Sequence, residues 1–195
     1  MQPFPGPVPS TTPPATTDAL RQARGINRQN TAMRKAARAW IKGQKPGLVW
    51  LTGASDAENE TIANLLDLRL HALGRHSVLL DAEHLRQHLG RDLGHSPEDQ
   101  AECLRRLGEV ARLMVDAGLI VIACCSLPLR AQRALVKTLF IPAEFVEVHL
   151  ALEDASSPFE RPEQAGLEVA THDCEAGQAA DQVVGHLRHI GWVPW

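Results

Sequence analysis

The first chemistry that the residue spacing indicates is phosphate binding, in the segment GASDAENET (53–61). The segment follows an apolar run and leads into a helix-favouring stretch. At such a junction the pattern G-x-x-x-x-G-K-[ST] presents backbone N–H groups, a helix amino terminus and a lysine to a polyphosphate. Gly53 is kept, but the second glycine, the lysine and the Mg²⁺-binding hydroxyl are replaced by Glu58, Asn59 and Glu60. The length of the phosphate-binding pattern is kept, whereas the residues that bind phosphate are replaced.

The charge of this segment is also unfavourable for a phosphate. Asp56, Glu58 and Glu60 place three carboxylates around one space. A like-charge contact at about 4 Å costs about 1 kcal/mol in water and about 4 kcal/mol at an effective dielectric constant of 20. Loss of the lysine removes a charge-assisted hydrogen bond of roughly 1.5–3 kcal/mol. We therefore expect an ordinary strand-to-helix turn and no bound cofactor. The residues that would face a nucleotide here are Gly53, Ser55, Asn59, Glu60 and Thr61.

Other acidic and thiol side chains raise the question of a metal site. Asp81 and Glu83 follow a second apolar run, and with Glu60 they offer the oxygen ligands that Mg²⁺ favours, but no phosphate would share the ion. The run His172-Asp173-Cys174 has no fourth ligand at a suitable spacing, which favours a loop. The sequence predicts no metal site.

The composition is that of one globular domain. The 195 residues are 44% apolar and 22% charged, and a net charge of −3 argues against a nucleic-acid partner. The Pro- and Thr-rich segment 1–17 lacks the features of a signal peptide, and no apolar run approaches the roughly 20 residues of a membrane span. We expect a cytoplasmic protein that contacts no membrane. Its cysteines, which we expect to stay reduced, are Cys103, Cys124, Cys125 and Cys174.

Short apolar runs alternate with amphipathic stretches along the chain. The strands predicted from these runs are 48–52, 77–81, 119–125, 145–150 and 167–171. The helices predicted between them are 59–73, 83–89, 97–116, 130–140 and 177–190. This alternation predicts a three-layer α/β/α sandwich with a mostly parallel sheet, whose ligands bind beyond the carboxyl ends of the strands. We expect a disordered tail over 1–17 and a single domain over 18–195, with a helical segment at 18–41.

Four segments resemble the adenylylsulfate (APS) kinase family. They are KGQKPGLVWLTG (42–53), LLDAEHLR (79–86), DLGHSPEDQAECLRRLGEVARLMVDAGLIVI (92–122) and SPFERPE (157–163). The third is long and specific, and the likeness extends over roughly residues 35 to 190. The resemblance implies a P-loop kinase fold and a family reaction in which MgATP phosphorylates the 3′-hydroxyl of APS to give PAPS.

The resemblance also implies roles for individual residues. Asp81 and Glu83 match the acids in the region that handles Mg²⁺ and the attacking hydroxyl. Arg86 matches an arginine that holds APS, and Arg105 with Arg106 matches an arginine pair at the substrate. On this basis Asp81 and Glu83 are the candidate catalytic residues, although only as remnants of that role.

The chain departs from the family pattern on both sides of the reaction. On the substrate side, His95 replaces a stacking Phe, Gln100 an Arg and Cys103 an Asn, and Leu127 replaces a serine in a later loop. His95 and Cys103 remain candidate substrate contacts. The basic lid that family members carry before S-P-Y-E is missing, because only ALEDAS (151–156) separates the run 145–150 from SPFERPE. Phosphoryl transfer needs such a closure to exclude water.

These departures favour a catalytically impaired homologue retained for binding or assembly. Two alternatives stay open. One is an active kinase in which Glu60 and Asp81 hold Mg²⁺, and the other is a non-catalytic protein that binds APS or PAPS through the remaining arginines. Because APS kinases form dimers, the resemblance also implies a homodimer or a heterodimer with a sulfate-activating enzyme. Trp192 and Trp195 are candidates either for docking on the domain or for such a contact.

Overall fold

Five parallel strands form the centre of the molecule. The computed structural model describes residues 28–53, 55–124, 129–152 and 159–194. The strands are β1 (Gly47–Gly53), β2 (Ser77–Asp81), β3 (Ile120–Cys124), β4 (Phe145–Ala151) and β5 (Leu167–Ala170). Their order across the sheet is β2-β3-β1-β4-β5, and every neighbouring pair is parallel. Every residue of β1 is buried, as expected for a central strand whose two faces are covered.

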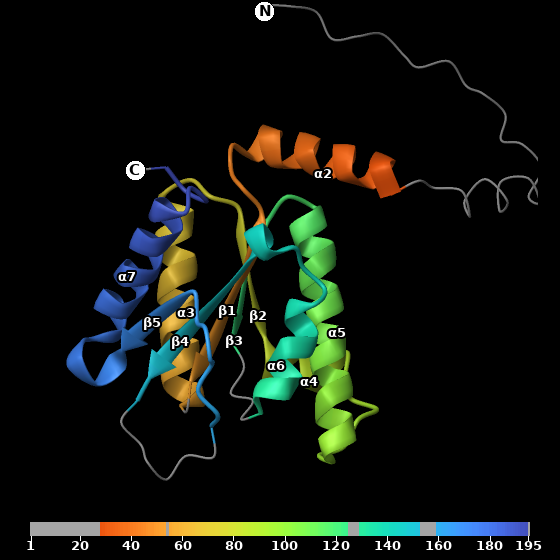
Figure 1. Cartoon of the computed structure of the whole chain (residues 1–195), viewed down its shortest axis with the longest axis vertical. Coiled ribbons are helices and arrows are strands. Elements are labelled where there is room, and N and C mark those ends of the chain that lie inside the picture. Colours follow the sequence, from red (N-terminus) through yellow and green to blue (C-terminus); the bar gives the residue numbers. More distant parts are fainter. Residues whose placement is uncertain (1–27, 54, 125–128, 153–158, 195) are drawn as a thin grey trace, which may run out of the picture.

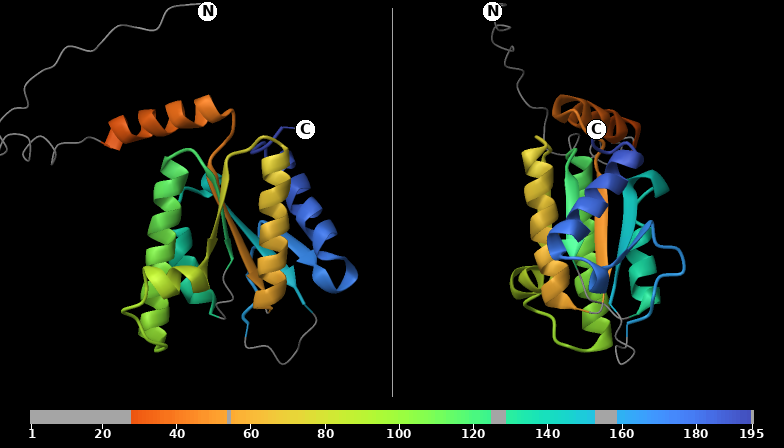
Figure 2. Two further views of the ribbon diagram at one scale, coloured as in Figure 1. Left: turned by 180° about the vertical axis from the view of Figure 1, so that it is seen from behind. Right: turned by 90° about the vertical axis from the view of Figure 1, so that its left-hand side faces the viewer.

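Helices cover both faces of this sheet (Figures 1 and 2). The helices of the described residues are α2 (Arg28–Lys42), α3 (Asp56–Ala72), α4 (Ala82–His88), α5 (Pro97–Asp116), α6 (Arg130–Lys137) and α7 (Ala176–His189). Short 3₁₀ turns are η1 (Pro142–Glu144) and η2 (Thr171–Asp173). One face carries α3 and α7, and the other carries α5 and α6. The expected three-layer α/β/α sandwich with a parallel sheet is confirmed. Among the described residues, no helix is long and apolar enough to cross a membrane.

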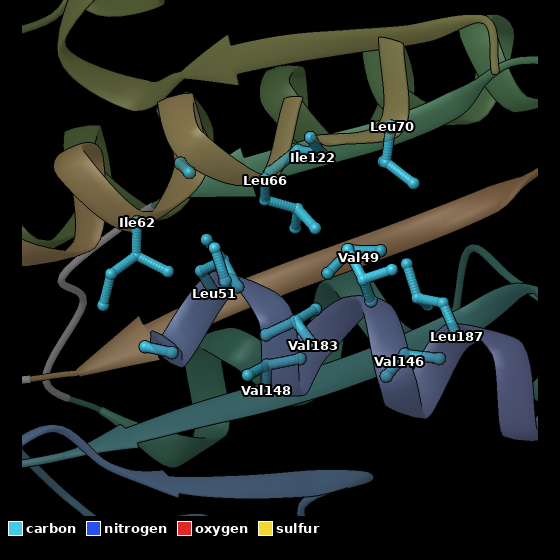
Figure 3. Packing of buried hydrophobic residues seen from close by; sticks show 14 of the residues in the cluster. Val49, Leu51, Ile62, Leu66, Leu70, Ile122, Val146, Val148, Val183 and Leu187 are labelled. Carbon is cyan, nitrogen blue, oxygen red and sulfur yellow. The ribbon is translucent and has the colours of Figure 1, made fainter. Parts of the chain in front are cut away.

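Two apolar layers hold the helices to the sheet. Figure 3 shows one of them, in which Val49 and Leu51 of β1 pack against Leu66 of α3 and Val183 of α7. The opposite layer includes Trp50 of β1, whose side chain is fully buried. Alternate residues of β1 therefore serve opposite layers, as the two-residue period of a strand requires.

The predicted elements agree with the structure except at their ends. The strand at 77–81 and the helix at 97–116 have the predicted bounds. The helix predicted from residue 59 begins three residues earlier, at Asp56. The helix predicted over 130–140 ends at Lys137, and the last strand ends at Ala170 because η2 follows it. The tail at 1–17 and the start of the segment 18–41 lie outside the described residues.

Helix α2 lies at the amino-terminal edge of the sheet, far from the carboxyl ends of the strands (Figure 1). Lys35 forms ion pairs with Glu144 at 2.6 Å and Asp116 at 3.2 Å. After the helix, the Gln44 side-chain amide donates to the backbone oxygens of His76 at 2.9 Å and Gly118 at 3.0 Å. These contacts join the helical segment and the residues after it to η1, the end of α5 and the start of β2.

The carboxyl-terminal end of the chain also packs on the body of the domain. Trp192 is only 4% exposed, and its ring lies so close to Gly47 that a Cβ at that position would be 2.0 Å from it. Of the two roles considered for Trp192, the structure supports docking. Trp195 lies outside the described residues.

Candidate functional site

The candidate residues cluster at the carboxyl edge of the sheet, beyond the ends of β1 and β2. This is the edge at which parallel α/β sheets bind ligands. The turn after β1 leads into α3, and the turn after β2 leads into α4. The segments 125–128 and 153–158, which follow β3 and β4, lie outside the described residues. They include Leu127, the position where the family pattern has a serine.

The turn after β1 is closed by its own helix cap. Ser55 is the N-cap of α3, and its side-chain oxygen accepts a hydrogen bond from the Glu58 backbone N–H at 3.3 Å. The N–H of Asn59 donates to the Ser55 backbone oxygen at 3.0 Å, which is already a helical bond. Amide groups that a phosphate-binding loop would direct at its ligand are therefore used within the first turn of α3.

Asn59, at the position of the lysine, fills the inside of this turn. Its side chain is 2% exposed, and its amide nitrogen lies 3.5 Å from the Gly53 backbone oxygen. A Cβ on Gly53 would lie 2.8 Å from the Asn59 Oδ1 and 2.8 Å from the Leu150 backbone oxygen. The glycine is therefore needed for close packing between β1, β4 and α3.

Glu60 and Thr61 lie in the second turn of α3 and are exposed. The Thr61 hydroxyl donates to the Ala57 backbone oxygen at 2.8 Å. Since this hydroxyl bonds within its own helix, it is not presented to the turn. The Asp56 side chain lies outside what the structure describes.

The two acids after β2 are engaged by nearby groups. Asp81 is the N-cap of α4, and its carboxylate accepts from the N–H groups of Glu83 at 3.0 Å and His84 at 3.4 Å. Glu83 forms an ion pair with Arg86 at 3.1 Å. Hydrogen bonds from Arg86 and Gln87 lower the pKa of the Glu83 carboxyl below its ordinary value. The lowered pKa keeps the Glu83 carboxylate ionised at neutral pH.

No metal centre is formed by the described residues, in which no group of three His, Cys, Asp or Glu side chains has the arrangement needed to hold an ion. The carboxylate of Asp81 is directed at the amino terminus of α4. The run His172-Asp173-Cys174 occupies η2 and the residue after it, where His172 contacts Asp173 at 3.3 Å.

Three of the predicted substrate residues come together from separate segments. The Arg86 guanidinium of α4 lies 3.1 Å from the His95 ring, which belongs to the turn before α5. Cys103 of α5 is buried, and burial raises the pKa of its thiol above the ordinary value, an effect that the positive charge of Arg86 opposes. Arg86 is therefore in contact with His95, and its charge acts on the Cys103 thiol. A role of these residues at a substrate stays a prediction.

The arginine pair on α5 divides between two roles. Arg106 binds both carboxylate oxygens of Asp92, at 2.7 and 2.9 Å, and donates to the Leu89 backbone oxygen at 2.8 Å. Arg105 is more exposed and binds Glu102 at 2.7 Å. Hydrogen bonds from both arginines lower the pKa of the Glu102 carboxyl to about 2. Arg106 therefore fixes the turn between α4 and α5, while Arg105 faces solvent.

Comparison with known proteins gives this site its context. A family model described as adenylylsulphate kinase matches residues 45–157, more than half of the chain. The adenylyl-sulfate kinase of Shewanella amazonensis is 36% identical over 188 residues, which cover 84% of this chain and 95% of that protein. The chain belongs to the adenylylsulphate kinase family.

Two further comparisons define how far the family likeness reaches. The bifunctional enzyme NodQ of Rhizobium tropici is 38% identical over 194 residues, which cover 87% of this chain and 31% of NodQ. The chain thus spans about a third of the length of that relative. The structure of the Mycobacterium tuberculosis APS kinase CysC in complex with AMPPNP and APS superposes with a TM-score of 0.67, at 30% identity over 74% of this chain and 99% of that one.

As a member of the adenylylsulphate kinase family, the chain would be expected to hold MgATP at the turn after β1. The residues present do not fit that ligand. Asn59 stands in place of the lysine and is packed inside the turn, and the Ser55 hydroxyl is used as the cap of α3. The nearest charged side chains of described position on this helix are the carboxylates of Glu58 and Glu60.

Sequence reasoning missed the role of Ser55 in this family member. The signal was present, because Ser55 and Glu58 form the S-x-x-E spacing of a helix amino terminus. Because residues 53–61 were compared with a phosphate-binding loop, the helix was predicted to begin at residue 59 and not at Asp56. The structure also brings His149, Arg133 and Phe159 into contact, a cluster that the sequence did not single out.

Proposed function

We propose that this chain is an adenylylsulphate kinase homologue that has lost phosphoryl transfer and is retained for binding or assembly. The observation that carries the proposal is the turn after β1, which is closed by the side chains of Ser55 and Asn59. A phosphate-binding loop must leave backbone N–H groups and a lysine free for its ligand. In this chain the N–H groups of Glu58 and Asn59 donate to Ser55, and the Asn59 side-chain amide donates to the Gly53 backbone oxygen.

Electrostatics support the same conclusion. A γ-phosphate at this turn would meet Glu58 and Glu60 on α3 instead of a lysine. The absence of one charge-assisted hydrogen bond removes roughly 1.5–3 kcal/mol, and each carboxylate nearby adds repulsion. Loss of the hydrogen bond alone lowers the affinity for ATP by about tenfold or more.

The test measures binding and turnover on the same preparation. Isothermal titration calorimetry with MgATP, ADP, APS and PAPS gives the affinities, and chromatography of the reaction mixture follows PAPS formation. We expect no heat of MgATP binding in the micromolar range and no PAPS. The Shewanella amazonensis relative is the positive control. Micromolar MgATP binding with turnover would overturn the proposal.

An active kinase with altered Mg²⁺ handling is the second candidate, and the likeness to proteins named adenylyl-sulfate kinase fits it equally well. In that case Glu60 and Asp81 would hold the ion. Asp81 caps α4 through two N–H groups, and Glu60 is exposed on α3, so neither carboxylate is prepared for that role. If PAPS does form, its rate in the Glu60→Gln variant decides whether Glu60 takes part.

A non-catalytic sulfonucleotide-binding protein is the third candidate, and the group formed by Arg86, His95 and Cys103 favours it. Arg86 contacts His95 at the carboxyl edge of the sheet and supplies a positive charge that acts on Cys103 and could hold an anionic ligand. Under this candidate APS or PAPS binds without ATP. Titration of the Arg86→Ala variant tests it, with Arg112→Ala on α5 as a matched control outside the group. Equal affinity in both variants would exclude a role for Arg86.

Assembly with a second protein is the other part of the proposal. Trp40 and Ile41 of α2 are 84% and 76% exposed, which is unusual for a tryptophan beside an isoleucine and is typical of an interface. The relative NodQ carries about two thirds of its length outside the matched region. We infer that α2 joins this domain to a second copy or to a sulfate-activating enzyme. Sedimentation of the chain alone and with such an enzyme distinguishes the two.

A further inference from the structure

A short segment before β5 is held against β4 and α6 by ring contacts, hydrogen bonds and an ion pair. We call residues 159–163, FERPE, the strap. Its Phe159 ring stacks on the His149 ring of β4, with centroids 5.4 Å apart and planes 6° from parallel. The Arg133 guanidinium of α6 lies 4.5 Å from the centre of the same Phe159 ring. Phe159 is therefore in contact with two basic side chains from two different elements.

The remaining contacts tie the strap to α6. The Glu160 carboxylate accepts from the Arg130 backbone N–H at 2.7 Å, at the amino terminus of α6, and Arg133 donates to the Glu160 backbone oxygen. Glu163 pairs with the Arg130 side chain at 2.5 Å. The strap lies on the side of the sheet that α6 covers (Figure 2, right). It thus joins α6 to β4 at the carboxyl edge.

His149 is the unusual member of this cluster. It is 3% exposed, and neither ring nitrogen forms a hydrogen bond to any described residue. A buried polar group without a partner costs free energy, and a buried charge costs more. The neutral ring is tolerated because Phe159 covers it with an apolar face. A protonated ring in the same place would be a desolvated cation.

The charged groups around His149 come from every neighbouring element. Arg133 of α6 and Arg161 of the strap oppose a positive charge on the ring, while Glu168, its register partner on β5, favours one. The Thr52 backbone on β1 also favours the protonated ring, and Glu147 lies on the same face of β4 but is paired with Arg133 at 3.2 Å. Burial outweighs these effects and holds the pKa of His149 below its ordinary value.

We propose that the strap is a pH-sensitive device, which stays on the sheet while His149 is neutral and is released when that ring binds a proton. Release uncovers the ring, so that the imidazolium is hydrated and moves out of the field of Arg133. The same movement frees the amino terminus of α6 from Glu160. Protonation of His149 on β4 thereby exposes the amino terminus of α6 at the carboxyl edge of the sheet.

The direction of the pH dependence follows from linkage. With the strap released, His149 titrates near its ordinary value of about 6.5, whereas with the strap in place burial lowers that pKa. The released state binds more protons below about pH 6.5, so the strap is stable above that pH and is destabilised as the pH falls. Each pH unit below about 6.5 shifts the ratio of released to bound strap by as much as tenfold, until the bound form also titrates.

Amide hydrogen exchange reports on the strap directly. The Arg130 N–H donates to Glu160, and the Gly166 N–H, just after the strap, donates to the Glu147 backbone oxygen at 2.8 Å. We expect the protection factors of these two amides to fall by as much as tenfold between about pH 7.5 and about pH 5.5, after correction for intrinsic exchange. The amide of Ile122 in β3 serves as the internal reference and should not change.

Variants separate protonation of His149 from general acid destabilisation. His149→Phe keeps a flat ring against Phe159 but cannot bind a proton, so its strap protection should vary less than about twofold over the same range. His186→Gln removes a half-buried histidine of α7 whose pKa is also lowered by burial, and it should leave the pH response intact. An equal response in wild type and His149→Phe would overturn the proposal, as would parallel loss of Ile122 protection.

A titration of the wild-type protein provides a second readout if His149→Phe does not fold. NMR of the imidazole resonances should place the pKa of His149 below about 6.5, and the Phe159→Ala variant should raise it towards that value because the ring becomes hydrated. If the strap responds to the proton, linkage requires a lowered pKa of His149 in the wild type and a higher one in Phe159→Ala. An unchanged pKa in Phe159→Ala would contradict it.

Discussion

The side chain of Asn59 is folded back onto the strand that precedes it, with its amide nitrogen 3.5 Å from the Gly53 backbone oxygen. The distance is long for a hydrogen bond, but the pair is buried and the packing is tight. Residues at the first glycine and the lysine of a phosphate-binding pattern are thus in contact with each other. This contact between Gly53 and Asn59 explains how the turn after β1 keeps its shape without a ligand.

The first prediction concerns the space around Gly53. Gly53→Ala places a methyl group 2.8 Å from both the Asn59 Oδ1 and the Leu150 backbone oxygen, so strands or side chains must shift. We expect the free energy of unfolding to fall by about 1–3 kcal/mol, measured by urea denaturation. Gly185→Ala is the matched control, since nothing lies within 4 Å of its new methyl group inside α7. It should raise stability by roughly 0.5–1 kcal/mol. Similar effects of the two changes would contradict the packing argument.

The second prediction concerns the cap of α3. Ser55→Ala removes the acceptor of the Glu58 N–H, and we expect a loss of about 0.5–2 kcal/mol in the free energy of unfolding. Ser55→Asp keeps an acceptor at the N-cap and should retain most of the stability. If Ser55 instead serves a ligand, both changes would lower the affinity for that ligand and Ser55→Ala would leave stability unaltered.

The starts of helices α3 and α5 show which features of the fold the sequence could predict. Ser96 and Pro97 mark the start of α5, and Gly118, with a φ of 87°, follows its end, so local signals agreed and both bounds were correct. The start of α3 was misplaced because the loop pattern and the S-x-x-E cap starting at Ser55 compete for the same residues. The structure favours the cap, which needs no ligand to satisfy its N–H groups.

The roles of the site residues stay a prediction, but helix geometry explains the contacts of the arginine pair. Arg105 and Arg106 are adjacent in sequence, but neighbours on a helix point about 100° apart, so both reach Glu102 while Arg106 also binds Asp92. The contact of His149 with the strap was not predictable, because a histidine in an apolar run gives no sign of which distant segment covers it.

The third prediction is a pH dependence of stability near Glu102. Its folded pKa is about 2, against an ordinary value of 4.5, because Arg105 and Arg106 bond to the ionised carboxylate. A lowered pKa stabilises the fold fully above about pH 4.5, and this contribution is lost as the pH falls towards 2. Glu102→Gln should flatten stability over that range while costing stability at neutral pH. Glu109→Gln, elsewhere on α5, is the control. Identical pH profiles for Glu102→Gln and wild type would refute the assignment.

The fourth prediction contrasts two tryptophans. Trp192 is 4% exposed and its ring covers Gly47, so Trp192→Ala leaves a cavity at the start of β1. We expect a loss of about 3–5 kcal/mol in the free energy of unfolding, measured in dilute protein. Trp40 is 84% exposed on α2, and Trp40→Ala should change the stability of the isolated chain by less than about 0.5 kcal/mol. If Trp40 belongs to an interface, Trp40→Ala shifts the sedimentation coefficient towards that of a single chain. Trp192→Ala should not cause this shift under conditions in which that variant is folded. A large stability loss in Trp40→Ala at low protein concentration would instead place its ring against the body of the domain.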